Sequence, residues 1–174
     1  MVKKVNDKKN PVGTVLTVPA LAVVLYMTAR FLLPEAEDVI RKLIIAVLLV
    51  TASVHDIFVK KIPVYVCIAI LFINVIYSLT DCFIPASWVF SAVSFLLLIA
   101  VYFINRDLIG LGDILLLTVC IQSMSPVGIM KFLFLAFTFS FLLGVLKCIR
   151  KGSMKKVSVP MAPCIASAFL LLAW

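Results

Sequence analysis

Long apolar stretches follow one another along almost all of this 174-residue chain, and most are about as long as a membrane-spanning helix. A helix needs about 20 apolar residues to cross a bilayer, and it satisfies its own backbone hydrogen bonds there. Apolar residues make up 64% of the chain, whereas soluble domains contain roughly 45–50%. We therefore predict an all-α polytopic membrane protein in the lipid bilayer. Seven helices are expected, over about residues 12–33, 39–58, 62–79, 86–104, 108–124, 127–149 and 159–174.

The distribution of positive charge predicts how these helices are threaded. A net charge of +8 does not require nucleic acid as a partner, because cytoplasmic loops of membrane proteins carry an excess of lysine and arginine. With the N-terminus in the cytoplasm, twelve of the sixteen lysines and arginines fall on the cytoplasmic side. We therefore expect a cytoplasmic N-terminus and no nucleic-acid partner.

The first apolar stretch follows a basic start, which is also typical of a signal peptide. However, residues 12–33 are long for one, and no clear small-residue cleavage site precedes Pro34. We expect an uncleaved helix. Residues 1–38 would then form a basic tail, a transmembrane helix and a short outer loop.

Two aspartates lie at the ends of predicted helices. Asp56 lies near the end of the second helix and is followed by Pro63, which suits the first turn of the next helix. Asp113 lies near the start of the fifth helix, after Gly110 and Gly112. Ionisable residues in membrane segments are costly and by default functional. The predicted threading brings both aspartates to the cytoplasmic face.

Two neighbouring carboxyl groups can activate water. Like charges in a poor dielectric repel, so such a pair shares one proton. One member then acts as general base on a water and the other as general acid, and the sequence does not assign which is which. This chemistry needs no metal or cofactor, and the five scattered cysteines indicate no zinc site or disulfide framework. Gly110 and Gly112 are expected to allow positive φ and close approach of a backbone.

Structural alternatives accompany each of these residues. Asp56 could form an ion pair with Lys60. Asp113 could simply be an acidic residue that the positive end of its helix dipole stabilises. His55 precedes Asp56, and we expect it to be hydrated at the interface.

These motifs together resemble those of the type IV prepilin peptidases, the G-x-G-D membrane aspartyl proteases that include archaeal preflagellin peptidases. The resemblance covers roughly residues 39–174 and rests on order, spacing and sidedness. It is carried by Asp56 with Ile62-Pro63, by Gly110-Leu111-Gly112-Asp113, and by Pro160-Met161-Ala162-Pro163 in the last predicted helix.

The resemblance implies a six-helix catalytic domain in the cytoplasmic membrane of a prokaryote, with one extra N-terminal helix. It implies catalytic roles for Asp56 and Asp113, and cleavage of the leader peptides of membrane-inserted prepilin-like precursors. Gly110, Gly112, Pro63, Pro160 and Pro163 would support the site. The paired C-x-x-C motifs linked to N-methylation in larger members are missing from this sequence, so peptidase activity without methyltransferase activity is expected.

Departures and competing interpretations accompany this resemblance. Val64 and Leu115 stand where many members have asparagine and lysine, which indicates a divergent branch. A presenilin or signal-peptide-peptidase relative would pair G-x-G-D with a Tyr-Asp motif, whereas His55 precedes Asp56 here. A non-catalytic assembly factor, or a small transporter using the aspartates as an ion relay, is the non-enzyme alternative. Transport favours polar residues near the bilayer midplane and paired halves, and no internal repeat is visible.

Overall fold

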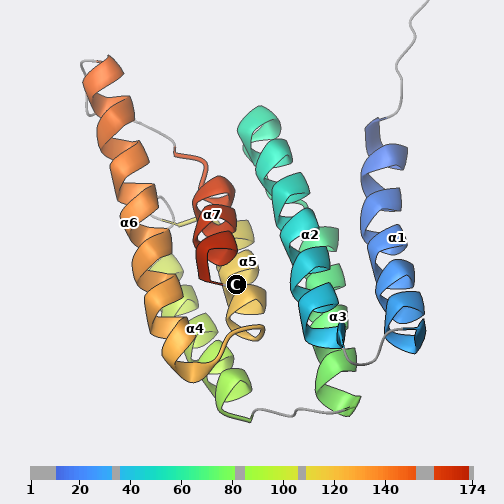
Figure 1. Ribbon diagram of the computed structural model, residues 1–174. Helices are drawn as coiled ribbons and strands as arrows, with labels where there is room; N and C mark the ends of the chain where they lie inside the picture. Colours follow the sequence, from blue (N-terminus) through green and yellow to red (C-terminus); the bar gives the residue numbers. More distant parts are fainter. Residues whose placement is uncertain (1–10, 33–35, 81–84, 106–108, 152–158, 173–174) are drawn as a thin grey trace, which may run out of the picture.

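The computed structural model describes residues 11–32, 36–80, 85–105, 109–151 and 159–172. This part of the chain is helical and contains no strand (Figure 1). The predicted basic tail over residues 1–10 lies outside the described residues. The helices are α1 (Pro11–Leu32), α2 (Glu37–Val59), α3 (Val64–Thr80), α4 (Pro85–Ile104), α5 (Leu111–Ile121), α6 (Pro126–Lys151) and α7 (Ala162–Leu172).

Seven helices in the predicted order are confirmed, but their lengths differ from the prediction. Among the residues that the structure describes in full, α2, α4 and α6 are long and apolar enough to cross a membrane. Helices α5 and α7 have 11 residues each, which corresponds to about 16 Å at 1.5 Å per residue. The predicted span over residues 108–124 was therefore too long at both ends, and the one over residues 159–174 was too long at its start. Apolarity alone cannot separate a helix from the extended apolar residues that precede it.

The short helices lie inside the bundle. Helix α7 packs against α2 and α6, and α5 packs against α3, α4 and α7 (Figure 1). In the most apolar window of α2 44% of the residues are buried, compared with 11% in α4 and α6. Helix α2 is therefore central, whereas α4 and α6 present apolar side chains outward, as contact with lipid requires. The fully buried core side chains include Ile45, Leu48, Leu49, Ile70, Leu116, Leu117 and Phe169.

The bundle has two chemically different ends. We call the end where α2 stops and where α5 and α7 begin the aspartate end. At the opposite end α2, α4 and α6 begin and α3 and α5 stop (Figure 1). There the side chain of Asn74 donates to the carbonyl of Val119 at 2.9 Å and accepts from the hydroxyl of Ser123 at 2.8 Å. These bonds tie α3 to the end of α5.

Helix α1 is attached to the bundle through a buried polar cluster. It packs against α2 and α3, and the hydroxyl of its fully buried Tyr26 donates to Glu37 at 2.8 Å. The Nε of Arg30 lies 3.5 Å from the same carboxylate. Because Glu37 is itself buried, the cluster satisfies a group that would otherwise be costly to hold there.

We predict that Tyr26→Phe loosens α1. The change removes the hydrogen bond to the buried Glu37 carboxylate and leaves it with Arg30 alone, and we expect it to lower the free energy of unfolding by about 1–3 kcal/mol. Thermal unfolding in detergent, with limited proteolysis between α1 and α2, measures this. Tyr102→Phe in α4, at a half-buried tyrosine, is the matched control. Equal unfolding midpoints for the two variants would show that the cluster does not hold α1.

Candidate active site

Asp56 is held at the end of α2 by the way that helix stops. Lys60 adopts a left-handed conformation (φ 56°), and its backbone N–H donates to the Asp56 carbonyl at 2.9 Å. Such a residue ends a helix because the next N–H turns back onto the last turn. Pro63 is buried and precedes α3, which begins at Val64, so its predicted place inside the first turn was wrong by one residue.

The carboxylate of Asp56 finds its partner on α7. The side chain is buried, with 6% of the residue exposed, and its Oδ2 accepts a hydrogen bond from the backbone N–H of Ala162 at 3.2 Å. Ala162 is the first residue of α7, and the first N–H groups of a helix have no partner within it. The positive end of α7 therefore faces the carboxylate of Asp56.

His55 closes the turn that follows Asp56. Its Nδ1 lies 2.8 Å from the carbonyl oxygen of Lys61, so the ring carries a proton on Nδ1 and donates it. The expectation that this histidine is merely hydrated was therefore wrong. The contact fixes the turn after α2 relative to the helix that carries Asp56.

We predict that His55→Ala loosens this turn. Removing one hydrogen bond of this kind lowers the free energy of unfolding by about 0.5–1.5 kcal/mol. Thermal unfolding in detergent measures the change, and His55→Asn, which can donate from the same region, is expected to restore part of it. A His55→Ala protein as stable as wild type would show that the bond to Lys61 contributes nothing.

Asp113 lies in the first turn of α5 and is partly buried. Gly110 is the N-cap residue of this helix, and its carbonyl accepts from the N–H of Ile114 at 3.2 Å. The Asp113 carboxylate turns back to the backbone amide of Gly110, as an acidic residue three positions after the N-cap does in a capping box. A Cβ added to Gly110 would lie 3.0 Å from Oδ2 of Asp113. Glycine at this position leaves the room that the carboxylate occupies.

Gly112 provides a close contact between two motifs distant in sequence. A Cβ added to it would lie 3.0 Å from Cβ of Ile62, in the turn between α2 and α3. The nearest atoms are thus the Cβ and Cα of Ile62 in this chain, and the predicted close approach of a substrate backbone stays a prediction. The prediction of positive φ was wrong: φ is −77° at Gly110, and Gly112 does not lie in the left-handed region either. The glycines here provide space.

The two aspartates are brought to the same end of the bundle. They are close enough for the charge of Asp56 to act on Asp113, and both act on Cys164 of α7. Helices α2 and α5 each pack against α3 and α7, so α7 links the two sides. Two carboxyl groups on different helices thus share one partly buried environment.

The prolines around the start of α7 shape this linkage. Pro160 precedes the helix and Pro163 is its second residue, so the prediction that both lie inside the last helix was wrong for Pro160. The carbonyls of Pro160 and Pro163 accept from Cys164 and Ser167. Two prolines here favour a helix start, and a start at Ala162 leaves its N–H free to reach Asp56. No role for Ala162 was predicted from the sequence, because a backbone N–H donor is not marked by any particular side chain.

Two described cavities lie outside the space between α2 and α5. One is apolar and lined by residues of α1, α2 and α3, and the other lies at the opposite end. A substrate groove between α2 and α5 stays a prediction. Among the described residues, no group of three or more His, Cys, Asp or Glu side chains is arranged to hold a metal ion.

Comparison with protein families identifies the family of this chain. The model of the type IV leader peptidase family matches residues 43–146. The chain belongs to this family. The matched segment contains Asp56, Pro63, Gly110, Gly112 and Asp113, whereas α1 and α7 lie outside it. Comparison with curated proteins and with solved structures found no match.

Family membership makes the chain a leader-peptidase-like membrane protease that processes precursor proteins. The resemblance seen in the sequence is therefore confirmed at the level of the family. The contact between Asp56 and Ala162 joins the matched segment to α7. The candidate site thus depends on a helix that follows the matched segment.

Proposed function

We propose that this protein is an aspartyl endopeptidase that cleaves the leader peptides of type IV prepilin-like precursors at the cytoplasmic edge of the membrane. One observation carries the proposal: Asp56, in the last turn of α2, and Asp113, in the first turn of α5, lie at one end of the bundle, where Gly112 meets Ile62 of the turn that follows α2. Membership of the leader peptidase family supports the substrate class. The threading predicted from the sequence, with twelve of the sixteen lysines and arginines on the cytoplasmic side, supports a cytoplasmic position for this end.

The proposed reaction uses one shared proton and one water. The ionised carboxylate takes a proton from the water as the water oxygen attacks the scissile carbonyl carbon. The protonated carboxyl group donates its proton to the carbonyl oxygen. The tetrahedral intermediate then collapses: the carboxyl group that took the proton from water gives it to the leaving amine as the carbon–nitrogen bond breaks. One hydroxyl group of the intermediate returns its proton to the other carboxylate as the carbonyl re-forms, so the dyad again holds one proton. Ala162 holds Asp56 through its backbone N–H.

The proposed substrate is a precursor whose own apolar segment sits in the bilayer. Such a precursor presents the end of its leader at the membrane edge, where the aspartate end of the bundle lies in the proposed orientation. The sequence supplies no methylation segment, and we propose peptidase activity without methyltransferase activity. A non-catalytic assembly factor or ion relay is less well supported, because a relay calls for polar groups along a path through the membrane.

Co-expression in membranes tests the proposal. The full chain is produced with candidate prepilin-like precursors, and the product is identified by mass spectrometry of its new N-terminus. We expect removal of the leader with an unmethylated N-terminus. Intact precursors in every combination, with the protein present in the membrane, would contradict the substrate class. A methylated product would contradict the proposed absence of methyltransferase activity.

A further inference from the structure

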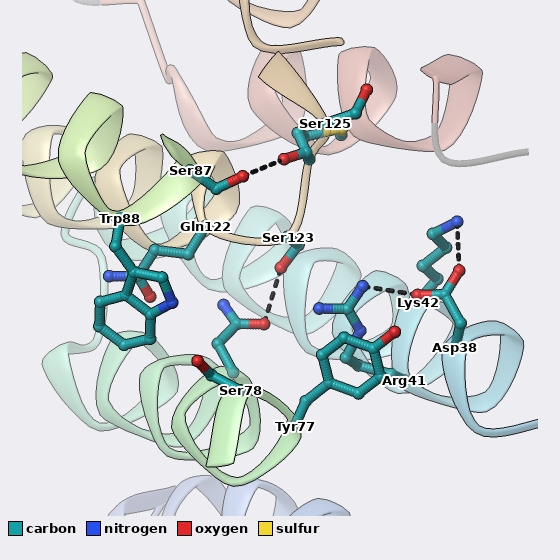
Figure 2. A pocket seen from close by; sticks show the side chains of 12 residues that line it. Asp38, Arg41, Lys42, Tyr77, Ser78, Ser87, Trp88, Gln122, Ser123 and Ser125 are labelled. Carbon is teal, nitrogen blue, oxygen red and sulfur yellow. Dashed lines mark hydrogen bonds and ion pairs between the residues drawn. The ribbon is translucent and has the colours of Figure 1, made fainter. Parts of the chain in front are cut away.

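A polar cavity lies at the end of the bundle opposite to the aspartates. It has a volume of about 230 Å³ and is lined by the first turns of α2 and α4, the end of α3 and the turn between α5 and α6 (Figure 2). A liquid water occupies about 30 Å³, so the cavity has room for several waters or one small polar group. It lies below the roughly 300–1,000 Å³ of typical sites for drug-sized ligands.

Arg41 is the buried charge of this cavity. Only 6% of the residue is exposed, and its guanidinium carbon lies 3.7 Å from the centroid of the Tyr77 ring. One guanidinium nitrogen donates to Asp38 at 2.6 Å, whereas Nε is buried and has no hydrogen-bond partner among the described residues. A buried donor on a charged group is costly to leave unsatisfied. Arg41, which lines the cavity, therefore keeps one buried N–H without an acceptor among the described residues.

Gln122 carries an unpaired acceptor. Its Oε1 is buried and lacks a hydrogen-bond partner among the described residues. Figure 2 shows Gln122 beside Trp88 on one side of the cavity and Arg41 beside Tyr77 on the other. A ligand that satisfies both must carry an acceptor at one end and a donor at the other.

The charge of the cavity favours an anionic acceptor. Arg41 and Lys42 share the single carboxylate of Asp38, at 2.6 and 2.7 Å, and these three are the charged residues among those that line the cavity. One positive charge is therefore in excess. The helix ends add little to this, because the N-termini of α2 and α4 and the C-termini of α3 and α5 lie at the same end and carry opposite partial charges.

We propose that this cavity binds a phosphate ester that also carries a hydroxyl or ammonium group. Phosphate oxygens suit the N–H donors of a guanidinium, and the hydroxyl or ammonium group donates to Gln122. A phospholipid headgroup and a water-soluble phosphate ester both have this chemistry. The site lies at the other end of the bundle from Asp56, so it does not depend on the proposed peptidase activity.

Calorimetric titration of the full chain in detergent tests the site. The probes are dioctanoyl phosphatidylglycerol, glycerol 3-phosphate and dioctanoylglycerol, which has no phosphate. We expect the phosphatidylglycerol to bind and the dioctanoylglycerol not to bind. Loss of a charge-assisted hydrogen bond weakens binding about tenfold or more, so Arg41→Gln is expected to do this. Lys131→Gln, at an exposed lysine of α6 outside the cavity, removes the same charge and is expected to have no effect.

A second variant separates loss of binding from loss of folding. Gln122→Leu removes the unpaired acceptor, so we expect it to keep or raise the thermal midpoint of the free protein while weakening binding of the probe. Equal affinity for glycerol 3-phosphate and the lipid would identify a soluble phosphate ester as the ligand, and binding of the lipid alone would identify a headgroup. The proposal is overturned if neither phosphate probe binds, if dioctanoylglycerol binds equally well, or if the folded variants bind like wild type.

Discussion

Asp56→Asn and Asp113→Asn are each expected to lower the rate of leader cleavage by about 10²–10⁴-fold, the usual contribution of a general acid or base. An amide has nearly the shape of a carboxyl group but neither accepts a proton from water nor donates one to a carbonyl. The measurement is the rate of precursor conversion in membranes at matched protein levels. Single and double variants should lose similar activity, because residues that act as a unit are not additive.

The thermal midpoint of each variant in detergent provides the control. Asp113→Asn keeps the shape of the side chain and an oxygen that can accept from the backbone amide of Gly110, so we expect no loss of stability. Asp56→Asn keeps an oxygen for the N–H of Ala162. Cleavage that survives either substitution would exclude the dyad and favour an ion relay or an assembly role. Lost cleavage with a much lower midpoint would instead indicate that the aspartate is structural.

Gly112→Ala is expected to lower cleavage by about tenfold to a hundredfold, since misplacement of a catalytic group by about 1 Å has effects of this size. The added Cβ would lie 3.0 Å from Cβ of Ile62. That atom is bonded directly to the backbone, so it cannot move aside unless the turn between α2 and α3 moves with it. The turn follows the last turn of α2, which carries Asp56, and Gly112 precedes Asp113, so the strain is transmitted to both carboxylates. Cleavage rate and thermal midpoint are measured together.

Gly144→Ala in α6 is the matched control. An added Cβ there would meet the nearest atom, Cγ2 of Val159, at 3.6 Å, which is ordinary contact. Alanine is the better helix former by about 0.5–1 kcal/mol, so we expect full cleavage and an equal or higher midpoint. Equal cleavage by the two alanine variants would show that the contact between Gly112 and Ile62 does not position the site.

Much of the helical order follows from the sequence because the bilayer leaves few choices. Apolar stretches separated by polar turns form helices, since no other open structure satisfies the backbone in hydrocarbon. The starts of α5 and α7 were misplaced because Ile109 and the residues before Ala162 are as apolar as the helices themselves. Pro160 and Pro163 marked the start of α7, but only the structure showed which of them lies inside it.

The candidate site was likewise predictable from the sequence only in part. Asp56 and Asp113 stand out in the sequence because a charge in an apolar segment is costly, and the motif around each is short and local. The partner of Asp56 does not stand out: the N–H of Ala162 is 106 residues away and is identical to that of any other residue. Similarly, no pattern links Gly112 to Ile62, because their contact depends on how two turns meet.

The sequence by itself determined that this chain forms membrane helices and which two carboxylates are candidates for chemistry, because both depend on the cost of placing polar groups in lipid. Only the tertiary structure decided what surrounds them. Packing of the short α7 beside α2 brings a free backbone N–H to Asp56, and packing at the opposite end buries Arg41 with an unmet donor. Such contacts arise from side-chain shape and backbone geometry across the whole bundle, which no local pattern records.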